Sequence, residues 1–263
     1  MSTDTPGAAA AGHTVFDPSK SSTFKLIQGA SFQIQYGDSS FAEGNVGTDT
    51  VDIGGATIDN QAVGIPTNVA QSFLSDVASN GLVGLGFESL STVRPQKQPT
   101  FLENIAPTLD EPVLTANLMS DGTGEYEFGT IDTTKYQGQL VNISVDASNG
   151  FWEFPSTVFA VGNGPQQAIK QAPSAIADTG TTLMLVSPEV TTAYYAQVQG
   201  AVLANSAGGY IYPCNTQLPS LAIAVGDVKV VLPGALLDFA KVGTNRQTGE
   251  DRKSPWIWST QKC

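Results

Sequence analysis

The chain has 263 residues, with 12 basic against 24 acidic side chains and a net charge of −12. This balance argues against nucleic acid and against an anionic membrane surface as partners, because no basic field is present to neutralise phosphate. The sequence has no apolar run of the roughly 18 residues that a membrane-spanning helix needs. Its one histidine, His13, argues against a zinc site or a Ser–His–Asp triad, so neither a metal nor a cofactor is expected.

The composition points instead to a protein rich in β-strands. Charged residues make up 14% of the chain and hydrophobic residues 41%, and 27 Gly and 15 Pro are spread along it as turn formers. Half-buried strands joined by polar turns have this composition, as in many secreted proteins. The start of the chain, MSTDTPGAAAAGHT, has neither the basic nor the apolar stretch of a signal peptide, so none is expected in this chain.

In the first half, small or polar residues alternate with apolar ones in two runs joined by the polar stretch GDSSFAE. This pattern predicts a β-hairpin with a long polar tip. A Pro-Thr pair opens the segment 99–106, which is therefore predicted to be helical. The strands expected in this half are 31–36, 44–53, 56–64, 112–118 and 125–131.

The second half also has apolar segments typical of strands, although its sequence is not a close repeat of the first half. Ser187 as N-cap and Pro188 in the first turn predict a helix over 187–199. The expected strands are 138–145, 151–161, 182–186, 210–213, 220–225 and 227–232. A boundary near 132–140 predicts an N-terminal lobe, 1–135, and a C-terminal lobe, 136–240. The tail, 241–263, holds five of the 12 basic residues and shows no strand alternation over GTNRQTGEDRKSP.

The sharpest motif is AIADTGTTLML at 175–185, in which Asp178 stands between two apolar segments of strand type. A carboxylate among apolar surfaces is costly unless it has partners or a chemical role. Gly180 permits a tight turn after the aspartate, and Thr179 and Thr181 offer hydroxyl groups to it. The alternative is an aspartate that only caps a turn.

Five ordered segments resemble the pepsin-like aspartic endopeptidases, and most of all the secreted fungal enzymes of the penicillopepsin type. They are FQIQYGD at 32–38, NGLVGLGF at 80–87, YEFGTID at 126–132, the Asp178 segment and YPCN at 212–215. The resemblance runs from about His13 to about Phe239. It implies an all-β, bilobal acid protease fold with few short helices, in which both lobes are incomplete.

The resemblance also implies roles for single residues. Asp178 matches the second catalytic aspartate of the family, and Tyr36, Gly37 and Asp38 match the flap that closes over substrate. Phe73 and Leu82 match positions that line the primary pocket, although simple core packing is the alternative for both. Gly180, Thr181 and Thr182 match positions that contact the aspartate or the substrate backbone. Cys214 matches half of a disulfide for which Cys263 is the remaining candidate, and Asn142-Ile143-Ser144 is a candidate N-glycosylation site.

The chemistry of the family needs two carboxylates that share one proton, one acting as a base on water and the other as an acid. No second Asp-Thr-Gly occurs in this chain, and Asp4-Thr5-Pro6 is rejected because it has Pro where the backbone needs Gly. We therefore expect Met1 to be an internal residue of a longer precursor and this chain to be inactive alone. The other hypotheses are a non-catalytic peptide- or partner-binding protein and a dimer that supplies the second carboxylate. The expected partners are a peptide or protein substrate, pepstatin-type inhibitors and a second copy paired through open strands, in an extracellular setting.

Overall fold

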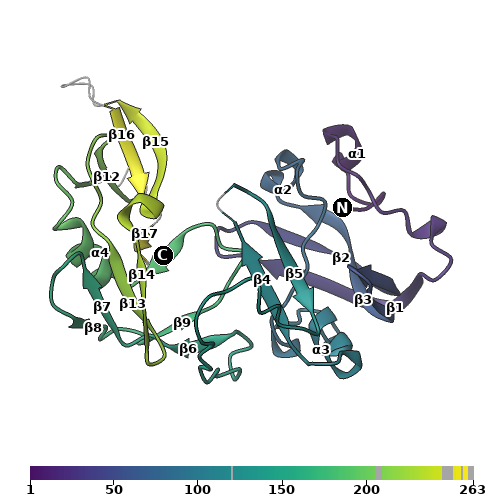
Figure 1. Ribbon diagram of the computed structural model, residues 1–263. Helices are drawn as coiled ribbons and strands as arrows, with labels where there is room; N and C mark the ends of the chain where they lie inside the picture. Colours follow the sequence, from purple (N-terminus) through teal and green to yellow (C-terminus); the bar gives the residue numbers. More distant parts are fainter. Residues whose placement is uncertain (120, 205–208, 245–250, 256, 260–263) are drawn as a thin grey trace. The chain divides into compact units, whose positions relative to one another are not determined.

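The computed structural model describes residues 1–119, 121–204, 209–244, 251–255 and 257–259. The chain divides into two compact units, Met1–Gln139 and Leu140–Cys263. Strands predominate in each unit and the helices are short, so the predicted all-β class with few short helices is confirmed (Figure 1).

The first unit is built on a three-stranded antiparallel sheet, β1–β2–β3 (Figure 1). Gln35 at the end of one strand pairs with Phe41 at the start of the next, so the predicted hairpin is present, with longer strands than expected. The pairing of the second and third strands shifts at Gly44, where a Cβ atom would lie 2.1 Å from the Ile65 carbonyl oxygen, so only glycine fits there. The bounds are β1 (Lys25–Gln35), β2 (Phe41–Ile53) and β3 (Ala56–Val69).

The predicted helix of the first unit forms as α3 (Phe101–Ile105), which contacts β3. Thr100 and Glu103 make a reciprocal capping box that fixes its start. Apolar side chains of this helix and of the sheet form the buried core of the unit, namely Val46, Ile65, Phe101, Leu102 and Ile105. A second hairpin follows, β4 (Leu114–Leu118) and β5 (Gly124–Phe128), close to where the alternation predicts it. The short helices of this unit are α1 (Ala8–Ala11), η1 (Pro18–Lys20), α2 (Gln71–Ser75), η2 (Glu88–Leu90) and η3 (Ala106–Thr108).

The second unit contains two four-stranded sheets, β14–β13–β7–β8 and β11–β12–β16–β15, and two strand pairs, β6–β9 and β10–β17 (Figure 1). The strands are β6 (Glu153–Pro155), β7 (Val158–Val161), β8 (Gln167–Ala168), β9 (Ser174–Ile176), β10 (Met184–Val186), β11 (Val202–Ala204), β12 (Gly209–Pro213), β13 (Leu221–Val225), β14 (Val228–Leu232), β15 (Asp238–Thr244), β16 (Asp251–Pro255) and β17 (Ile257–Ser259). The helices are α4 (Pro188–Tyr195), which the sequence predicts, and the short η5 (Gly234–Leu237).

The core of the second unit lies where α4 packs on β7 and its neighbours. The Tyr194 hydroxyl donates to the Pro219 carbonyl at 2.8 Å, and the Tyr195 ring stacks on Tyr210 with centroids 4.2 Å apart. The hydrogen bond lets Tyr194 be buried without leaving its hydroxyl group unpaired. The buried members of the cluster are Phe159, Val161, Val190, Tyr194, Tyr195, Val198, Tyr212, Leu221 and Leu237.

One predicted strand is absent, and one segment without alternation forms a strand. Residues 138–145 form no strand, although their apolar residues alternate. Leu140 and Val141 are exposed there, and without a neighbouring strand an alternating segment gains no ladder of hydrogen bonds. The tail shows no strand alternation, yet β16 lies within it and pairs with β12 and β15. Backbone pairing with available edges requires no alternation of side chains.

Candidate functional site

Asp178 lies in the loop between β9 and β10 of the second unit. β9 pairs antiparallel with β6, and the pairing is extended by the Ala177 N–H, which donates to the Trp152 carbonyl at 3.0 Å. The ladder therefore ends one residue before Asp178. A turn at residues 179–180 follows it directly.

The Asp178 carboxylate is held through both of its oxygens. The Gly180 N–H donates to Oδ1 at 2.8 Å, and the Thr181 hydroxyl donates to Oδ2 at 2.5 Å. A Cβ atom on residue 180 would lie 3.2 Å from Oδ1, so glycine permits this close approach. Thr179 and Thr181 were both expected to offer a hydroxyl group to the carboxylate, and the bond described is the one from Thr181. Thr182 follows in the same loop and is exposed.

The carboxylate is exposed, which corrects the buried setting that its apolar flanks suggest. Ile176 before it is 44% exposed and Leu185 after it is 55% exposed, so these flanks do not cover the loop. The orientation of Asp178 therefore comes from its two hydrogen bonds and not from apolar packing.

Other aspartates of the chain also accept hydrogen bonds from residues that follow them closely. Five other aspartates begin turns of the type Asp-x-Ser/Thr, in which the residue two positions later donates its backbone N–H, and in most cases its hydroxyl, to Oδ1. Hydrogen bonds from these residues lower the pKa of each carboxyl group. Asp178 differs from these five because its two donors lie on different oxygens, an arrangement that it shares with Asp52. The five turns begin at Asp17, Asp38, Asp121, Asp132 and Asp146.

The hairpin tip at 36–40 belongs to the first unit and joins β1 to β2. The Tyr36 N–H donates to the Ser40 carbonyl at 2.8 Å, and Asp38 Oδ1 accepts the Ser40 N–H at 2.9 Å and the Ser40 hydroxyl at 2.6 Å. Ser39 has a φ of 70°, a conformation that non-glycine residues adopt mainly in turns. Ser40 is buried and organises this tip, and the sequence reading missed it. The Asp-x-Ser spacing is the signal that identifies it.

Of the pocket candidates, Tyr36 and Phe73 are brought together, and Leu82 is not placed with them by any contact described. The two rings meet edge to face with centroids 5.6 Å apart, and burial raises the pKa of the Tyr36 phenol. Gly37 is exposed at the tip, and the Leu82 side chain is 64% exposed. Beside the hairpin lies an open hollow of about 640 Å³, lined by Gln33, Ile34, Gln35, Phe41, Glu43 and Asn68.

The sequence also singles out His13, Asn142 and the two cysteines. Both ring nitrogens of the buried His13 face backbone carbonyl oxygens, of Ser79 at 3.1 Å and of Leu74 at 3.2 Å, which is a structural role. Cys214 is half-buried and Asn142 is exposed, while Cys263 lies outside the described residues. Among the residues that the structure describes, no group of three or more His, Cys, Asp or Glu side chains could hold a metal ion.

Comparisons with known proteins define the class. Residues 1–249 match the family described as eukaryotic aspartyl protease. An aspergillopepsin A-like aspartic endopeptidase of Aspergillus fumigatus is 64% identical over 251 residues, which cover 95% of this chain and 59% of the relative. Endothiapepsin of Cryphonectria parasitica is 44% identical over 244 residues, which cover 93% and 58%. Aspergillopepsin-1 of Aspergillus oryzae is 40% identical over 248 residues, which cover 94% and 60%.

The chain therefore belongs to the eukaryotic aspartyl protease family and has its pepsin-like all-β fold. It spans about three fifths of the length of these relatives. The family match reaches residue 249, ten residues beyond the end of the resemblance at Phe239. In the part of the chain that the structure describes, no helix is long and apolar enough to cross a membrane.

Proposed function

We propose that this chain belongs to an endopeptidase in which Asp178 is one of the two carboxylates that activate water at a peptide bond. The observation that carries the proposal is the pair of hydrogen bonds to Asp178, one on each oxygen. A carboxylate fixed in this way is preorganised to hold a water molecule or to share a proton with a second acid. Proton sharing between two close carboxylates splits their pKa values, so that one serves as base and the other as acid.

The 263-residue chain by itself is proposed to be inactive. Its sequence contains Asp-Thr-Gly once, and the chemistry needs two carboxylates. The same observation favours a second candidate function, in which the chain binds a peptide or partner protein without cleaving it. In both, the hairpin with Tyr36, Gly37 and Asp38 serves as the flap, and Phe73 and Leu82 contribute to a side-chain pocket.

The wider setting follows from the same assignment. Segments 1–135 and 136–240 are the two lobes, and peptides or pepstatin-type inhibitors are the ligands. An extracellular location is consistent with sugar attachment at the exposed Asn142. Exposed apolar side chains such as Leu82 and Val83 favour self-association of the isolated chain.

The decisive experiment completes the chain with the part of the Aspergillus fumigatus relative that it does not span. The completed protein should cleave a denatured protein in acid, pepstatin should block the cleavage, and Asp178→Ala should abolish it. Cleavage that survives Asp178→Ala would refute the catalytic role of this aspartate. The matched control is Asp146→Ala, at another aspartate of the same unit that begins a turn, which should leave cleavage intact.

Experiments on the 263-residue chain alone distinguish the binding function from a dimer that supplies the second carboxylate. Pepstatin that stabilises it against heat, without any cleavage, would support the binding function. Cleavage whose rate grows with the square of the protein concentration would instead show that a second copy supplies the missing carboxylate.

A further inference from the structure

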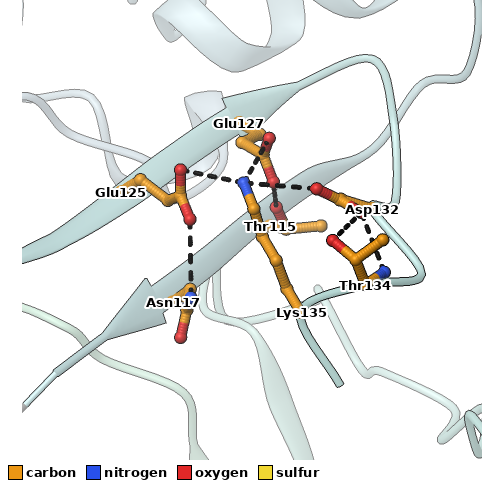
Figure 2. Close-up of polar contacts among 7 residues, drawn as sticks. All are labelled: Thr115, Asn117, Glu125, Glu127, Asp132, Thr134 and Lys135. Atoms are coloured by element: carbon orange, nitrogen blue, oxygen red, sulfur yellow. Dashed lines mark hydrogen bonds and ion pairs between the residues drawn. The ribbon is translucent and has the colours of Figure 1, made fainter. Parts of the chain in front are cut away.

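Lys135 lies within reach of three carboxylates in the first unit (Figure 2). Its Nζ is 2.8 Å from Glu125 Oε2, 2.7 Å from Glu127 Oε1 and 3.7 Å from Asp132 Oδ2. Glu125 and Glu127 are two positions apart on β5, so their side chains leave the same face of the strand. One lysine thus ties β5 to the segment that follows it along the chain.

The carboxylates are themselves positioned by neighbouring groups. The Thr115 hydroxyl donates to Glu127 at 3.4 Å, and the Asn117 amide donates to Glu125 at 3.5 Å. Both pairs stand directly opposite each other in the β4–β5 register. The acidic face is therefore part of the hairpin and presents a fixed target to the ammonium group.

The third carboxylate belongs to the turn that carries the lysine. Asp132 Oδ1 accepts the Thr134 N–H at 2.8 Å and its hydroxyl at 2.7 Å, while the Lys135 N–H donates to the Asp132 carbonyl at 3.1 Å. Lys135 is thereby held at the end of a closed turn. The boundary of the unit, at Gln139, lies four residues further on.

Charge makes the contact sensitive to pH. Three carboxylates surround one ammonium group, so protonation of the acids removes the attraction. Lys135 lowers the pKa of Glu125, and Glu125 and Glu127 raise the pKa of Lys135. Hydrogen bonds from Thr134, and then Lys135, lower the pKa of Asp132. A lowered carboxylate pKa means that the stabilisation is present above the unfolded-state pKa and is lost as the pH falls through the folded-state value.

We propose that Lys135 is an acid-released latch that fastens the junction segment 132–139 to the β4–β5 hairpin. At neutral pH the junction leaves the first unit from a fixed point. In acid Glu125 and Asp132 take up protons, their attraction to Lys135 is lost, and the segment 132–139 is released from the β4–β5 hairpin. This device is independent of any proteolytic activity.

Hydrogen exchange of the Thr134 and Lys135 amides, which are both hydrogen-bonded, tests the latch. After correction for intrinsic exchange, their protection should fall about three- to tenfold between about pH 6.5 and about pH 3.5, as expected for the loss of two or three ion pairs at a surface. Lys135→Gln should show the low protection at both pH values, and Lys135→Arg should keep the pH dependence. The control Lys20→Gln removes a lysine that is 82% exposed with one acidic partner at 3.5 Å, and should behave as the unchanged chain.

Amides of the β2–β3 ladder report whether the unit as a whole stays folded in acid. If the β2–β3 amides lose protection in acid, the test rests on the comparison of Lys135→Gln with the unchanged chain at about pH 6.5. The Thr134 and Lys135 positions of the variant must then be less protected than those of the unchanged chain. Equal protection in these two proteins at that pH would overturn the proposal. So would protection that stays constant with pH while the β2–β3 ladder remains intact.

Discussion

Leu221 provides a direct test of the core assigned to the second unit. Its side chain is fully buried on β13, where Leu221 pairs with Val161 on one side and Leu232 on the other. Replacement by alanine removes three carbon groups, which costs about 2.4 kcal/mol at about 0.8 kcal/mol each. The cavity left in the core against the buried face of the sheet adds to this, so the free energy of unfolding should fall by about 3–4 kcal/mol.

Tryptophan fluorescence during urea unfolding is the appropriate assay. All three tryptophans, Trp152, Trp256 and Trp258, belong to the second unit by sequence, so the signal reports on that unit. With a slope of about 2 kcal/mol per molar urea, the midpoint should fall by about 1.5–2 M in Leu221→Ala.

Leu236 is the matched control, because it lies in the same unit and its side chain is 60% exposed. Leu236→Ala should change the free energy of unfolding by no more than about 0.5 kcal/mol. Similar effects for the two leucines would refute the arrangement of this core, and so would a loss below about 1 kcal/mol in Leu221→Ala.

Three further substitutions test single contacts. Tyr194→Phe leaves a buried carbonyl without its donor and should cost about 1–2 kcal/mol in urea unfolding, whereas Tyr126→Phe, at a residue 42% exposed, should cost little. Gly180→Ala places a methyl group 3.2 Å from Asp178 Oδ1 and should shift the Asp178 carboxyl carbon resonance, and an unchanged spectrum would contradict the tight turn. His13→Ala leaves the carbonyl that accepts from the imidazole N–H without its donor and should lower the protection of first-unit amides by about 1–3 kcal/mol.

The sequence predicted elements best where local signals and tertiary pairing agree. The hairpin formed by β1 and β2 has alternating strands and a polar tip, and α3 begins directly after the Pro-Thr pair that predicts its start. The segment 138–145 alternates but forms no strand. An alternating segment forms a strand only when another strand lies beside it. Whether such a strand is present depends on distant parts of the chain, which the segment's own sequence does not reveal.

The candidate site was predictable in its contacts but not in its environment. The bond from Thr181 to Asp178 follows from the order of residues in one loop, so the sequence reveals it. The exposure of Asp178 depends on what covers Ile176 and Leu185, which no local pattern determines. The latch at Lys135 was missed for a similar reason, because its partners on β5 come together with it only after the hairpin and the following turn have formed.

The distribution of donors around Asp178 also fixes how many acceptor positions it can still offer. An ionised carboxylate has about four lone-pair sites, two on each oxygen. In the turn at Asp38 both donors occupy Oδ1, so the lone pairs that can still accept a hydrogen bond lie on Oδ2. At Asp178 each oxygen has one donor and keeps one lone pair. The carboxylate can therefore accept one further hydrogen bond on each oxygen. Both bonds can come from one water molecule, or one can come from a water molecule and the other from a neighbouring protonated acid.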